Sequence, residues 1–504
     1  MRWQRNKAKI TNKTYGCVTI IAMIKSIEFI NFRNLSGKYQ LNTRINLLVG
    51  KNSSGKTNLL DGIRLAFSTI TGDYFRISKT DFKNSDDSTP ITIKVELDDS
   101  AIPSLDFLDI TGATHCGFVV IVKKSRSGRY SKELRLLSGN KVNYEIVVED
   151  PAIPKVQTIP LIRAEDIYTD GLATNLIDFI ESEDAYQRVK DESKAKLKEE
   201  IAPKVNEFKS LCQKFKQDLD IEMSDPRLSN ERLFLVDGSS EEHRSKIGSG
   251  YRSIANVMLN LIGEGQGIIL IDEIENHLHP ALVRMLLREL RKHDSITVIA
   301  TTHSPVVVND AKIEELIDVS NIRMDELDEK TQNKLNLFLH PGRGELIFGD
   351  NIVLVEGYTE ELILNNYAIE HGLNWTIVNV AGVMFQPYIE LGHLLGKKMV
   401  VMSDDDRTKS TDGISTSRFK NLKELCEAKN IKLIDIENTL ETDLHRNGFL
   451  DFAIDYLEPV ENHPDYFVAK NRQKAIIAER LIEEAICLSR WHAIRDIENE
   501  FRSN

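Results

Sequence analysis

Gly50-Lys51-Asn52-Ser53-Ser54-Gly55-Lys56-Thr57 matches the pattern G-x-x-x-x-G-K-[ST] at every fixed position. The run before it, Ile45 to Val49, is short and apolar, as in a buried strand, and Asn58 to Phe67 has apolar residues at helical spacing. A strand, a glycine-bearing loop and a helix are the setting in which this pattern binds phosphate. The sequence therefore predicts a P-loop whose backbone N–H groups and helix N-terminus face the phosphates. A chance glycine and serine turn is the alternative, and the flanking strand and helix weigh against it.

Each part of the predicted loop has an expected role at a nucleotide. The glycines let the loop wrap around the phosphates, Lys56 reaches the β- and γ-phosphates, and the Thr57 hydroxyl ligates Mg²⁺. The residues expected at the nucleotide are Gly50, Asn52, Ser54, Gly55, Lys56 and Thr57.

The composition is that of an ordinary globular protein of 504 residues, long enough for about three domains. No apolar run approaches the roughly 18 residues that a membrane helix needs, so no membrane association is expected. The net charge of −12 and the isoelectric point near 5.6 give no global basic signature, so any nucleic acid must be bound through local patches or metal ions. Five scattered cysteines without a C-x-x-C pair favour the reducing cytoplasm.

Pattern changes along the chain divide it into five segments. We expect a disordered leader, a strand-rich lobe, a charged helical insertion in which Pro203 breaks the helix, a second lobe, and a parallel α/β unit after the cluster Pro341-Gly342-Arg343-Gly344. The apolar stripe of the insertion either packs on its own head or forms a dimerisation arm. The predicted segments are 1–22, 23–165, 166–235, 236–340 and 341–504.

Two further buried strands end in polar residues suited to ATP hydrolysis. Gly267 to Ile271 is followed by Asp272, expected to hold Mg²⁺, and Glu273, expected to polarise the attacking water. The next apolar strand, from Ser295, ends at His303. Together with the P-loop, this order of strands indicates an ATPase.

A second group of acidic residues lies beyond residue 350. The strand Asn351 to Val355 leads into Glu356, and the strand Lys398 to Met402 leads into Ser403-Asp404-Asp405-Asp406. In a parallel sheet such residues emerge at the same edge, where their charges repel unless divalent cations neutralise them. Oxygen ligands of this kind suit Mg²⁺ or Mn²⁺, and two such ions hydrolyse phosphodiesters.

The first part of the chain resembles the ABC-type ATPase heads of the SMC, RecF and OLD kind. Ile271 to Pro280 looks like their Walker B motif and D-loop, and His303 like their switch histidine. Ile247 to Arg252 stands where the ABC signature belongs, which in that family completes the ATP site of another protomer. The sequence departs from L-S-G-G-Q, with Gly at the serine position and Tyr251 at the glutamine position, and no Q-loop glutamine is assigned. The signature residues implied are Gly248, Ser249 and Gly250.

The last part resembles the TOPRIM domain of topoisomerases, primases and OLD-family nucleases. Its first motif is matched by Glu356 and Glu360, and its D-x-D motif by Asp404 and Asp406, with Asp405 in the variable place. The resemblance also implies a small residue between the motifs, a metal-binding glutamate in a T-L-E-x-D-L segment and a late lysine that steadies the transition state. These are Gly382, Glu441 and Lys474, with Lys470 as the alternative lysine.

The order of the two parts resembles OLD-family ATP-dependent endonucleases found in bacterial anti-phage systems, such as Gabija-like or retron-associated ones. The resemblance implies an ABC-type head, mixed β with a P-loop α/β core and a helical insertion, followed by a TOPRIM domain. It further implies an ATP-regulated endonuclease that cuts DNA with Mg²⁺ or Mn²⁺. An ATPase sensor or scaffold whose partner cuts, and a TOPRIM RNase that cleaves RNA such as tRNA, remain alternatives. Expected partners are a second copy of the chain, in a homodimer or larger oligomer, and a neighbouring-gene helicase or reverse transcriptase with its msDNA.

Overall fold

The computed structural model describes most of the chain beyond the first 23 residues. The predicted leader and Gly248 lie outside the described residues. Within the described part, no helix is both long and apolar enough to cross a membrane. The described ranges are 24–41, 43–71, 75–97, 117–125, 128–138, 141–142, 161–162, 194–215, 219–223, 233–237, 249–262, 267–293, 296–320, 326–337, 342–382, 384–410, 413–470, 474–484 and 487–502.

The chain divides into two compact units, each of which is considered by itself. The first unit comprises Met1–Leu48 and Ser53–Thr301, and the second comprises Val49–Asn52 and Thr302–Asn504.

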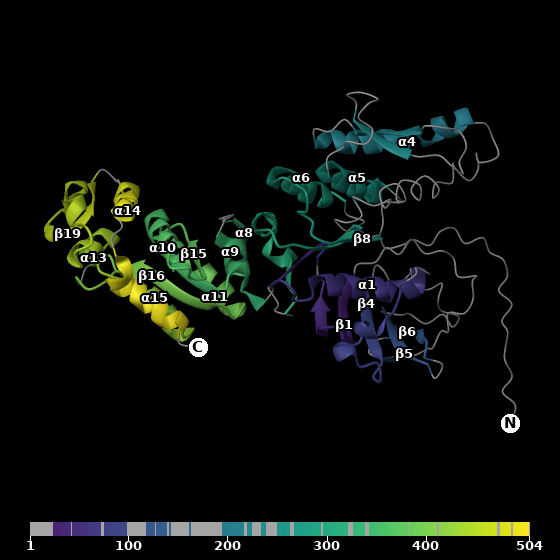
Figure 1. Ribbon diagram of the computed structural model, residues 1–504, viewed down its shortest axis with the longest axis horizontal. Helices are drawn as coiled ribbons and strands as arrows, with labels where there is room; N and C mark the ends of the chain where they lie inside the picture. Colours follow the sequence, from purple (N-terminus) through teal and green to yellow (C-terminus); the bar gives the residue numbers. More distant parts are fainter. Residues whose placement is uncertain are drawn as a thin grey trace. The chain divides into compact units, whose positions relative to one another are not determined.

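The first unit contains an antiparallel sheet with the strand order β2-β1-β4-β5-β6-β7. β4 alternates fully and partly buried residues, as expected for a strand with one face on a core. Helix α1 (Lys56–Thr71) lies along this sheet (Figure 1), where Phe67 meets the Phe118 ring edge-on at 5.2 Å. The strands are β1 (Ile24–Phe32), β2 (Leu35–Gln40), β4 (Ile91–Leu97), β5 (Gly117–Lys124), β6 (Tyr130–Ser138) and β7 (Lys141–Val142).

A second sheet carries the predicted P-loop. Its parallel strands lie in the order β3-β12-β11-β8, namely β3 (Ile45–Val49), β12 (Ile296–Thr301), β11 (Gly267–Ile271) and β8 (Leu161–Ile162). Every residue of β3 and β12 is buried, which explains their mostly apolar sequences, interrupted by Asn46 in β3 and by Thr297 and Thr301 in β12. Because the strands are parallel, the segments after β3, β11 and β12 leave the sheet at the same edge.

The helical insertion differs from the prediction at Pro203. Instead of two helices, one helix, α4 (Lys194–Lys214), runs through this exposed proline. An exposed position allows water to bond the carbonyl group that the proline cannot pair, so the helix need not end.

α4 packs against helix α5 (Ser249–Ile262) and strand β9 (Leu219–Met223), which pairs with β10 (Leu233–Asp237). Its apolar side chains Phe208, Leu211 and Cys212 are buried. The described part of the insertion therefore packs on its own head, one of the two alternatives that the sequence left open. Helix α6 (Pro280–Leu290) completes this unit.

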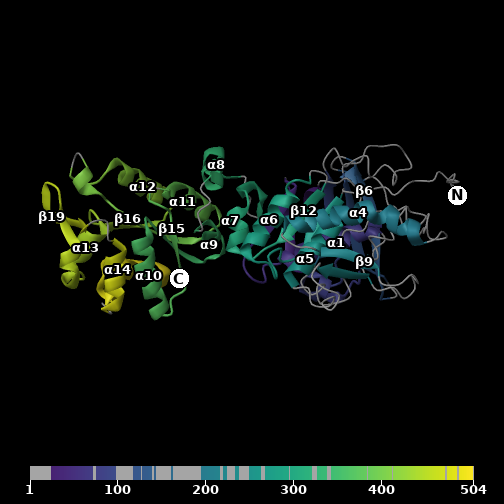
Figure 2. The same ribbon diagram turned by 90° about the horizontal axis from the view of Figure 1, so that it is seen from above.

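The second unit is built around a four-stranded parallel sheet in the order β15-β14-β16-β17. Helices α11 and α12 lie on one side of the sheet and α10 and α14 on the other (Figure 2). Val353 and Val400, from the two central strands, are fully buried in the core that includes α10, α13, α14 and α15. The strands are β14 (Asn351–Val355), β15 (Trp375–Asn379), β16 (Lys398–Asp404) and β17 (Lys432–Ile436), with a hairpin of β18 (Leu457–Val460) and β19 (His463–Ala469).

The helices of this unit confirm the predicted alternation of strands and helices. They are α7 (Pro305–Asp310), α8 (Glu329–Leu337), α9 (Gly342–Phe348), α10 (Tyr358–Glu370), α11 (Phe385–Leu394), α12 (Ser417–Ala428), α13 (Leu440–Arg446), α14 (Lys474–Glu483) and α15 (His492–Arg502), with the short strand β13 (Leu316–Asp318) after α7. The predicted fold class, a mixed-β P-loop head with a helical insertion followed by a parallel α/β domain, is confirmed.

An ion pair between a buried carboxylate and a partly exposed imidazole attaches α15 to α13. Asp443, which is 4% exposed, accepts a hydrogen bond from Trp491 Nε1 at 2.6 Å and lies 3.0 Å from His492 Nε2. The hydrogen bond to Asp443 raises the pKa of His492 and outweighs the opposing effect of burial. The charged imidazole therefore stabilises the folded state more than the unfolded state.

We predict a pH-dependent loss of stability in His492→Gln. Because the folded-state pKa is raised, the stabilisation is complete below the unfolded value of about 6.5 and disappears as the pH rises through the folded value. The imidazole is partly exposed, so we expect only about 0.5 kcal/mol at pH 5.5 after solvent screening. Urea unfolding from pH 5.5 to 9 measures it, with His463→Gln in the exposed hairpin as the control. A wild-type advantage that grows above pH 7 would contradict this assignment.

Candidate active sites

The P-loop is held by an asparagine from the antiparallel sheet. Gly50 and Gly55 have φ values of 144° and 108°, conformations that favour glycine. A Cβ on Gly55 would lie 2.7 Å from Asn34 Oδ1. Asn34 Nδ2 donates to the Ser54 carbonyl at 3.1 Å, and Asn58 Nδ2 donates to Asn34 Oδ1 at 2.8 Å. The sequence analysis missed Asn34, because nothing in its local sequence indicates that it reaches the loop.

The acidic end of β11 lies beside the start of α1. Thr57 Oγ1 is 3.2 Å from each carboxylate oxygen of Asp272. Thr301, at the end of β12, donates to Asp272 Oδ1 at 2.7 Å and accepts from the Glu273 backbone N–H at 2.7 Å. The structure thus brings together the two predicted Mg²⁺ ligands and adds Thr301, which fixes the direction of the Asp272 carboxylate.

Glu273 differs from Asp272 in its backbone and in its exposure. It is an exposed, non-glycine residue with a φ of 54°, and its carboxylate accepts from Asn276 Nδ2 at 3.2 Å. A left-handed conformation at such a residue stores strain of a kind often found at functional sites. Lys56, by contrast, is 5% exposed.

The remaining predicted nucleotide contacts lie on other segments. His303 is half-buried and follows the end of β12 by two residues. Ser249 and Gly250 begin α5, where a Cβ on Gly250 would lie 2.4 Å from the His277 carbonyl oxygen. Glycine at position 250 therefore permits a close backbone approach to the predicted D-loop.

The second candidate site lies at the C-terminal edge of the parallel sheet in the second unit. Glu356 follows β14, and its Oε1 accepts from Ser403 Oγ at 2.5 Å and from the Asp404 N–H at 3.1 Å. The Gly382 N–H donates to the Glu356 carbonyl at 2.7 Å, and Gly382 has a φ of 92°. β14, β16 and the loop after β15 therefore meet at Glu356.

Three more acidic side chains approach one another beside Glu356. Burial raises the pKa of Asp404, and the carboxylates of Glu356 and Glu360 raise it further. Burial also raises the pKa of Glu360, which is 7% exposed. The field of Glu441 acts in the same direction on both groups. The carboxylates of Glu356, Glu360, Asp404 and Glu441 are therefore near enough to one another to interact electrostatically.

Lys474 is the lysine that lies at this cluster. Its Nζ is 3.4 Å from Glu441 Oε1. Burial lowers the pKa of Lys474, but Glu441, Asp404 and Glu360 outweigh burial and raise it, so the amine is charged. Of the two lysines considered from the sequence, Lys474 contacts the acids.

Glu441 provides the test of whether a metal ion suits this cluster. It is 1% exposed, and neither of its carboxylate oxygens has a hydrogen-bond partner. Its helix is fixed, because the Thr439 and Thr442 hydroxyls donate to the Phe467 carbonyl at 2.7 and 2.9 Å. Lys474 partly balances Oε1 at 3.4 Å, but Oε2 has no donor, and a buried anionic oxygen without a donor is costly unless a cation binds it, so the residues fit a hard divalent ion. Among the residues that the structure describes, no three His, Cys, Asp or Glu side chains are arranged so that they could hold a metal ion as they stand.

Asp405 has a structural role, unlike the acids on either side of it. It is 1% exposed and accepts from the Asn438 N–H at 2.8 Å and from Arg407 Nε at 2.8 Å. Asp405 thus anchors the loop after β16 to the loop after β17, consistent with its place at the variable position of the D-x-D motif.

Asp406 has two cationic partners that the sequence analysis did not identify. Lys409 Nζ lies 2.8 Å from Oδ1, and Arg418 Nη2 lies 3.0 Å from Oδ2. Arg418 Nη2 also lies 3.0 Å from Glu356 Oε1. Asp406 has a φ of 50°, the left-handed region that a non-glycine residue rarely adopts. Arg418 could not be found from the sequence, because it begins a surface helix with no motif around it.

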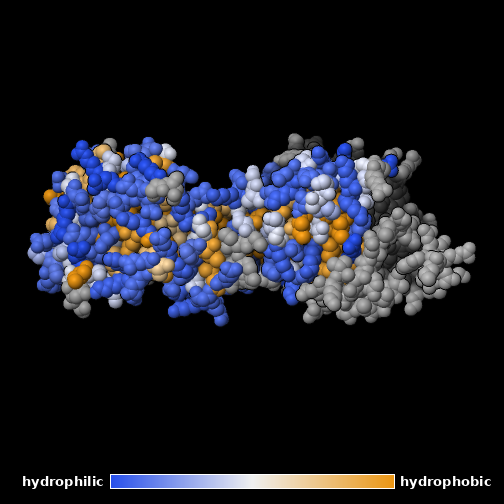
Figure 3. All heavy atoms as spheres, turned by 90° about the horizontal axis from the view of Figure 1, so that it is seen from below, coloured by the Kyte–Doolittle hydropathy of each residue, from blue (hydrophilic) through white to orange (hydrophobic). Residues whose placement is uncertain are grey.

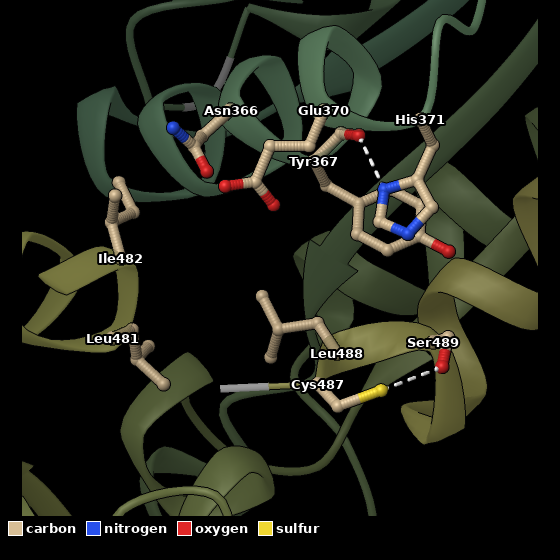
Figure 4. A pocket seen from close by; sticks show the side chains of 9 residues that line it. All are labelled: Asn366, Tyr367, Glu370, His371, Leu481, Ile482, Cys487, Leu488 and Ser489. Carbon is tan, nitrogen blue, oxygen red and sulfur yellow. Dashed lines mark hydrogen bonds between the residues drawn. The ribbon is translucent and has the colours of Figure 1, made fainter. Parts of the chain in front are cut away.

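A cavity of about 230 Å³ opens near the other end of α10 (Figure 4). It lies between α10, α14 and the turn at Leu488, and Cys487 Sγ lies 3.1 Å from Ser489 Oγ beside it. Of the α10 residues that line the cavity, Asn366 is the nearest to Glu360 along the helix, and it lies six positions beyond it. None of the predicted site residues lines this cavity, so the candidate chemistry lies at the carboxylates.

The visible surface of the second unit is mostly hydrophilic, with hydrophobic side chains in small separate groups (Figure 3). The exposed large hydrophobic residues Tyr358, at 61%, and Ile369, at 79%, lie near opposite ends of α10. Single exposed residues of this kind do not form an extended apolar interface.

The fold and the two sites define a P-loop ATPase joined to a parallel α/β domain with an acidic site of the TOPRIM type. A family model described as "AAA domain, putative AbiEii toxin, Type IV TA system" matches residues 45–309. That match spans more than half of the chain, and the chain therefore belongs to this family of AAA domains. A second model, "Overcoming lysogenization defect protein-like, TOPRIM domain", matches residues 347–406.

Two known proteins are similar to more than half of the chain. The chain is 24% identical over 388 residues to the "OLD nuclease" of Thermus scotoductus, covering 68% of this chain and 72% of that protein. It is 24% identical over 357 residues to an "ATP/GTP phosphatase" of Helicobacter pylori, covering 62% of this chain and 91% of that protein.

Among solved structures, an Smc head bound to the C-winged helix domain of ScpA has a TM-score of 0.42 and 14% identity, covering 58% of this chain and 94% of that one. The family matches confirm the resemblance to OLD-type proteins and the predicted class of enzyme, an ATP-binding hydrolase with a TOPRIM nuclease domain. The two domains imply the use of a nucleotide and of divalent metal.

We predict that Asp404→Asn stabilises the metal-free protein. The substitution removes a charge from a buried cluster of like charges, a change of the kind that typically adds about 1 kcal/mol at a functional site. Mn²⁺ should raise the free energy of unfolding of the wild type more than that of the variant.

Urea unfolding in EDTA and in MnCl₂ measures both effects. Asp465→Asn, which neutralises an exposed carboxylate, is the matched control and should leave both values unchanged. An Asp404→Asn protein that is less stable than the wild type in EDTA would show that the carboxylates do not repel one another.

Proposed function

We propose that the chain is an ATP-regulated endonuclease that hydrolyses DNA with Mg²⁺ or Mn²⁺ and acts as an effector of anti-phage defence. The observation that carries the proposal is the cluster of Glu356, Glu360, Asp404 and Glu441 beside Lys474. The nuclease domain implies nucleic-acid binding, and the name of the Thermus relative supports nuclease activity here. The description of the matched AAA family as a putative toxin of a toxin–antitoxin system supports a defensive role.

The proposed ligands of the divalent ions are Glu356, Glu360, Asp404, Asp406 and Glu441. When bound, such ions supply an activated water and stabilise the charge on the leaving oxygen. Neighbouring groups position two of these acids. The Ser403 hydroxyl and the Asp404 N–H donate to Glu356, and the Thr439 and Thr442 hydroxyls fix the helix that carries Glu441 by donating to the Phe467 carbonyl. Lys474, charged and adjacent to Glu441, is placed to donate to a phosphate oxygen as negative charge develops.

The first test is cleavage by purified protein. We expect Mn²⁺-dependent nicking or degradation of DNA that Glu356→Ala or Asp404→Ala lowers about 10³-fold, since loss of one ligand forfeits several kcal/mol of transition-state stabilisation. Glu390→Ala, which removes a carboxylate paired with Lys429 at 3.0 Å on another face, is the control.

Three outcomes separate this proposal from its alternatives. Cleavage at the wild-type rate in both variants contradicts the site assignment. Cleavage confined to RNA replaces DNA with RNA as the substrate. Metal-dependent binding without cleavage of either nucleic acid favours a scaffold whose partner cuts.

Regulation by ATP is supported by a run of contacts within the second unit. α7 begins two residues after His303, and its terminal carbonyls at Asn309 and Ala311 accept from Arg343 of α9 at 2.8 and 2.6 Å. Arg343 is 1% exposed, and burial lowers its pKa to about 10, so it stays charged at neutral pH. A Cβ on Gly344 would lie 2.7 Å from Pro305 Cα, so α7 and α9 are in close contact.

α9 is in turn attached to both strands that carry the acids. It ends three residues before β14, and Lys397, which immediately precedes β16, donates to the Ile347 and Gly349 carbonyls at 2.7 Å each. A P-loop residue, Lys51, lies 2.7 Å from Asp350 at the start of β14. A shift of α7 with nucleotide state would therefore be passed to Glu356 and Asp404.

Assembly into a homodimer or larger oligomer also belongs to the proposal. In ABC-type heads the signature at the start of α5 acts on the nucleotide of another copy, so Ser249 and Gly250 need a second chain. The described insertion packs on its own head, and we therefore assign the contact between copies to the nucleotide-bound heads.

We predict that Glu273→Gln retains ATP, stalls its hydrolysis and sediments as a dimer of the 57.3 kDa chain. The amide cannot accept a proton from the attacking water, so the closed state accumulates. Lys56→Ala should bind ATP weakly and show no ATP-dependent dimer. Cleavage should change with ATP in Glu273→Gln and not in Lys56→Ala.

Sedimentation and DNA cleavage are measured with and without ATP for both variants. A strict monomer under all conditions contradicts assembly through the heads. Identical cleavage with and without ATP in both variants shows that the two sites are not coupled.

A further inference from the structure

Arg418 occupies the place between two acids that belong to different motifs of the second site. Its Nη2 lies 3.0 Å from Glu356 Oε1, 3.0 Å from Asp406 Oδ2 and 3.2 Å from the Asp404 carbonyl oxygen. One nitrogen therefore serves three acceptors from the ends of β14 and β16. This is the arrangement of oxygen atoms that a cation bridging the two motifs would find.

The guanidinium is not bound in its most favourable way. Nη1 is buried without a hydrogen-bond partner, so neither carboxylate is held by the parallel pair of N–H bonds that arginine forms best. The Arg418 side chain is 29% exposed, which leaves it a route to solvent. Arg418 therefore neutralises charge on the two carboxylates without forming the bidentate hydrogen bonds of the most stable arginine–carboxylate pairs.

The backbone beneath Arg418 is fixed, so that only its side chain needs to move. The Thr416 side chain caps α12 by accepting from the Phe419 N–H, and the Thr416 N–H donates to the Asp405 carbonyl at 3.2 Å. Asp405 is itself anchored to Asn438. Arg418 can therefore leave the acids by rotating its side chain while the loop keeps its place.

We propose that Arg418 is an internal counter-cation that holds Glu356 and Asp406 until a divalent ion displaces it. The inference rests on the proposed metal-dependent function of this site. Metal binding is then an exchange of cations, and the released guanidinium, a planar donor suited to phosphate, becomes available to the substrate only after the metal has bound. The chain thereby sets an order, with metal before nucleic acid.

The test measures Mn²⁺ binding in the absence of DNA and ATP, from the electron paramagnetic resonance signal of free Mn²⁺. Arg418→Gln should bind Mn²⁺ about tenfold more tightly than the wild type, because two partly buried ion pairs no longer compete. Lys409→Gln, which removes the 71% exposed partner of Asp406, should change the affinity less than twofold because solvent screens that charge. Arg480→Gln, which breaks a surface pair with Glu483, should change nothing.

A second measurement uses the unmodified chain. Phenylglyoxal labelling followed by peptide mass spectrometry should show Arg418 reacting faster when Mn²⁺ is added, while Arg480 keeps its rate. This readout does not depend on how a variant folds.

The outcomes separate this inference from the proposed function. Unchanged or weaker Mn²⁺ affinity in Arg418→Gln, or unchanged labelling of Arg418 in a wild type that binds Mn²⁺ and cleaves DNA, overturns the exchange alone. Equal Mn²⁺ binding by the wild type and Glu356→Ala overturns both the exchange and the metal site on which it rests.

Discussion

Repulsion among carboxylates at the C-terminal edge of one parallel sheet is the constraint on which the second unit depends. β14 and β16 are neighbours, so the residues that follow them meet, and Glu360 and Glu441 approach from α10 and α13. Burial and mutual repulsion raise the pKa of Asp404 and of Glu360. Such a cluster is stable only with positive charge, which Lys474 and Arg418 provide in part.

The acidic residues of the first unit, Asp272 and Glu273, are less buried than Glu360 and Glu441 of the second unit. Asp272 and Glu273 directly follow β11. The Thr301 hydroxyl donates to the Asp272 carboxylate and accepts from the Glu273 backbone N–H. Glu273 is exposed, which is consistent with its proposed role at an attacking water. In the proposed function, the acids of the head serve a nucleotide that arrives with its own Mg²⁺, whereas those of the second unit bind ions from solution.

The sequence predicted those parts of the sites that are tied to strand ends. The P-loop, Asp272, Glu356 and Asp404 each lie at the end of an apolar strand, and backbone geometry alone brings the ends of parallel strands together. Glu441 and Lys474 came from the resemblance to a family, and the structure places them in contact.

What the sequence could not predict depends on contacts between distant segments. Arg418, Asn34 and Arg343 lie in no motif, and they bind Glu356, Ser54 and the carbonyls of Asn309 and Ala311, which are 62, 20, 34 and 32 residues away along the chain. At Pro203 the sequence predicted a helix break that the structure does not have. The rule that proline ends a helix did not hold there, because the proline lies on an exposed face of α4.

The central claim is that the acids of the second unit form a divalent-metal centre. Its most direct test is the anomalous diffraction of Mn²⁺ in crystals of the full chain. We expect anomalous peaks coordinated by Glu356, Glu360, Asp404, Asp406 and Glu441, with the Arg418 guanidinium displaced from Glu356. Mn²⁺-soaked crystals without a peak at these carboxylates, or with Arg418 still bridging Glu356 and Asp406 beside a bound ion, would contradict it.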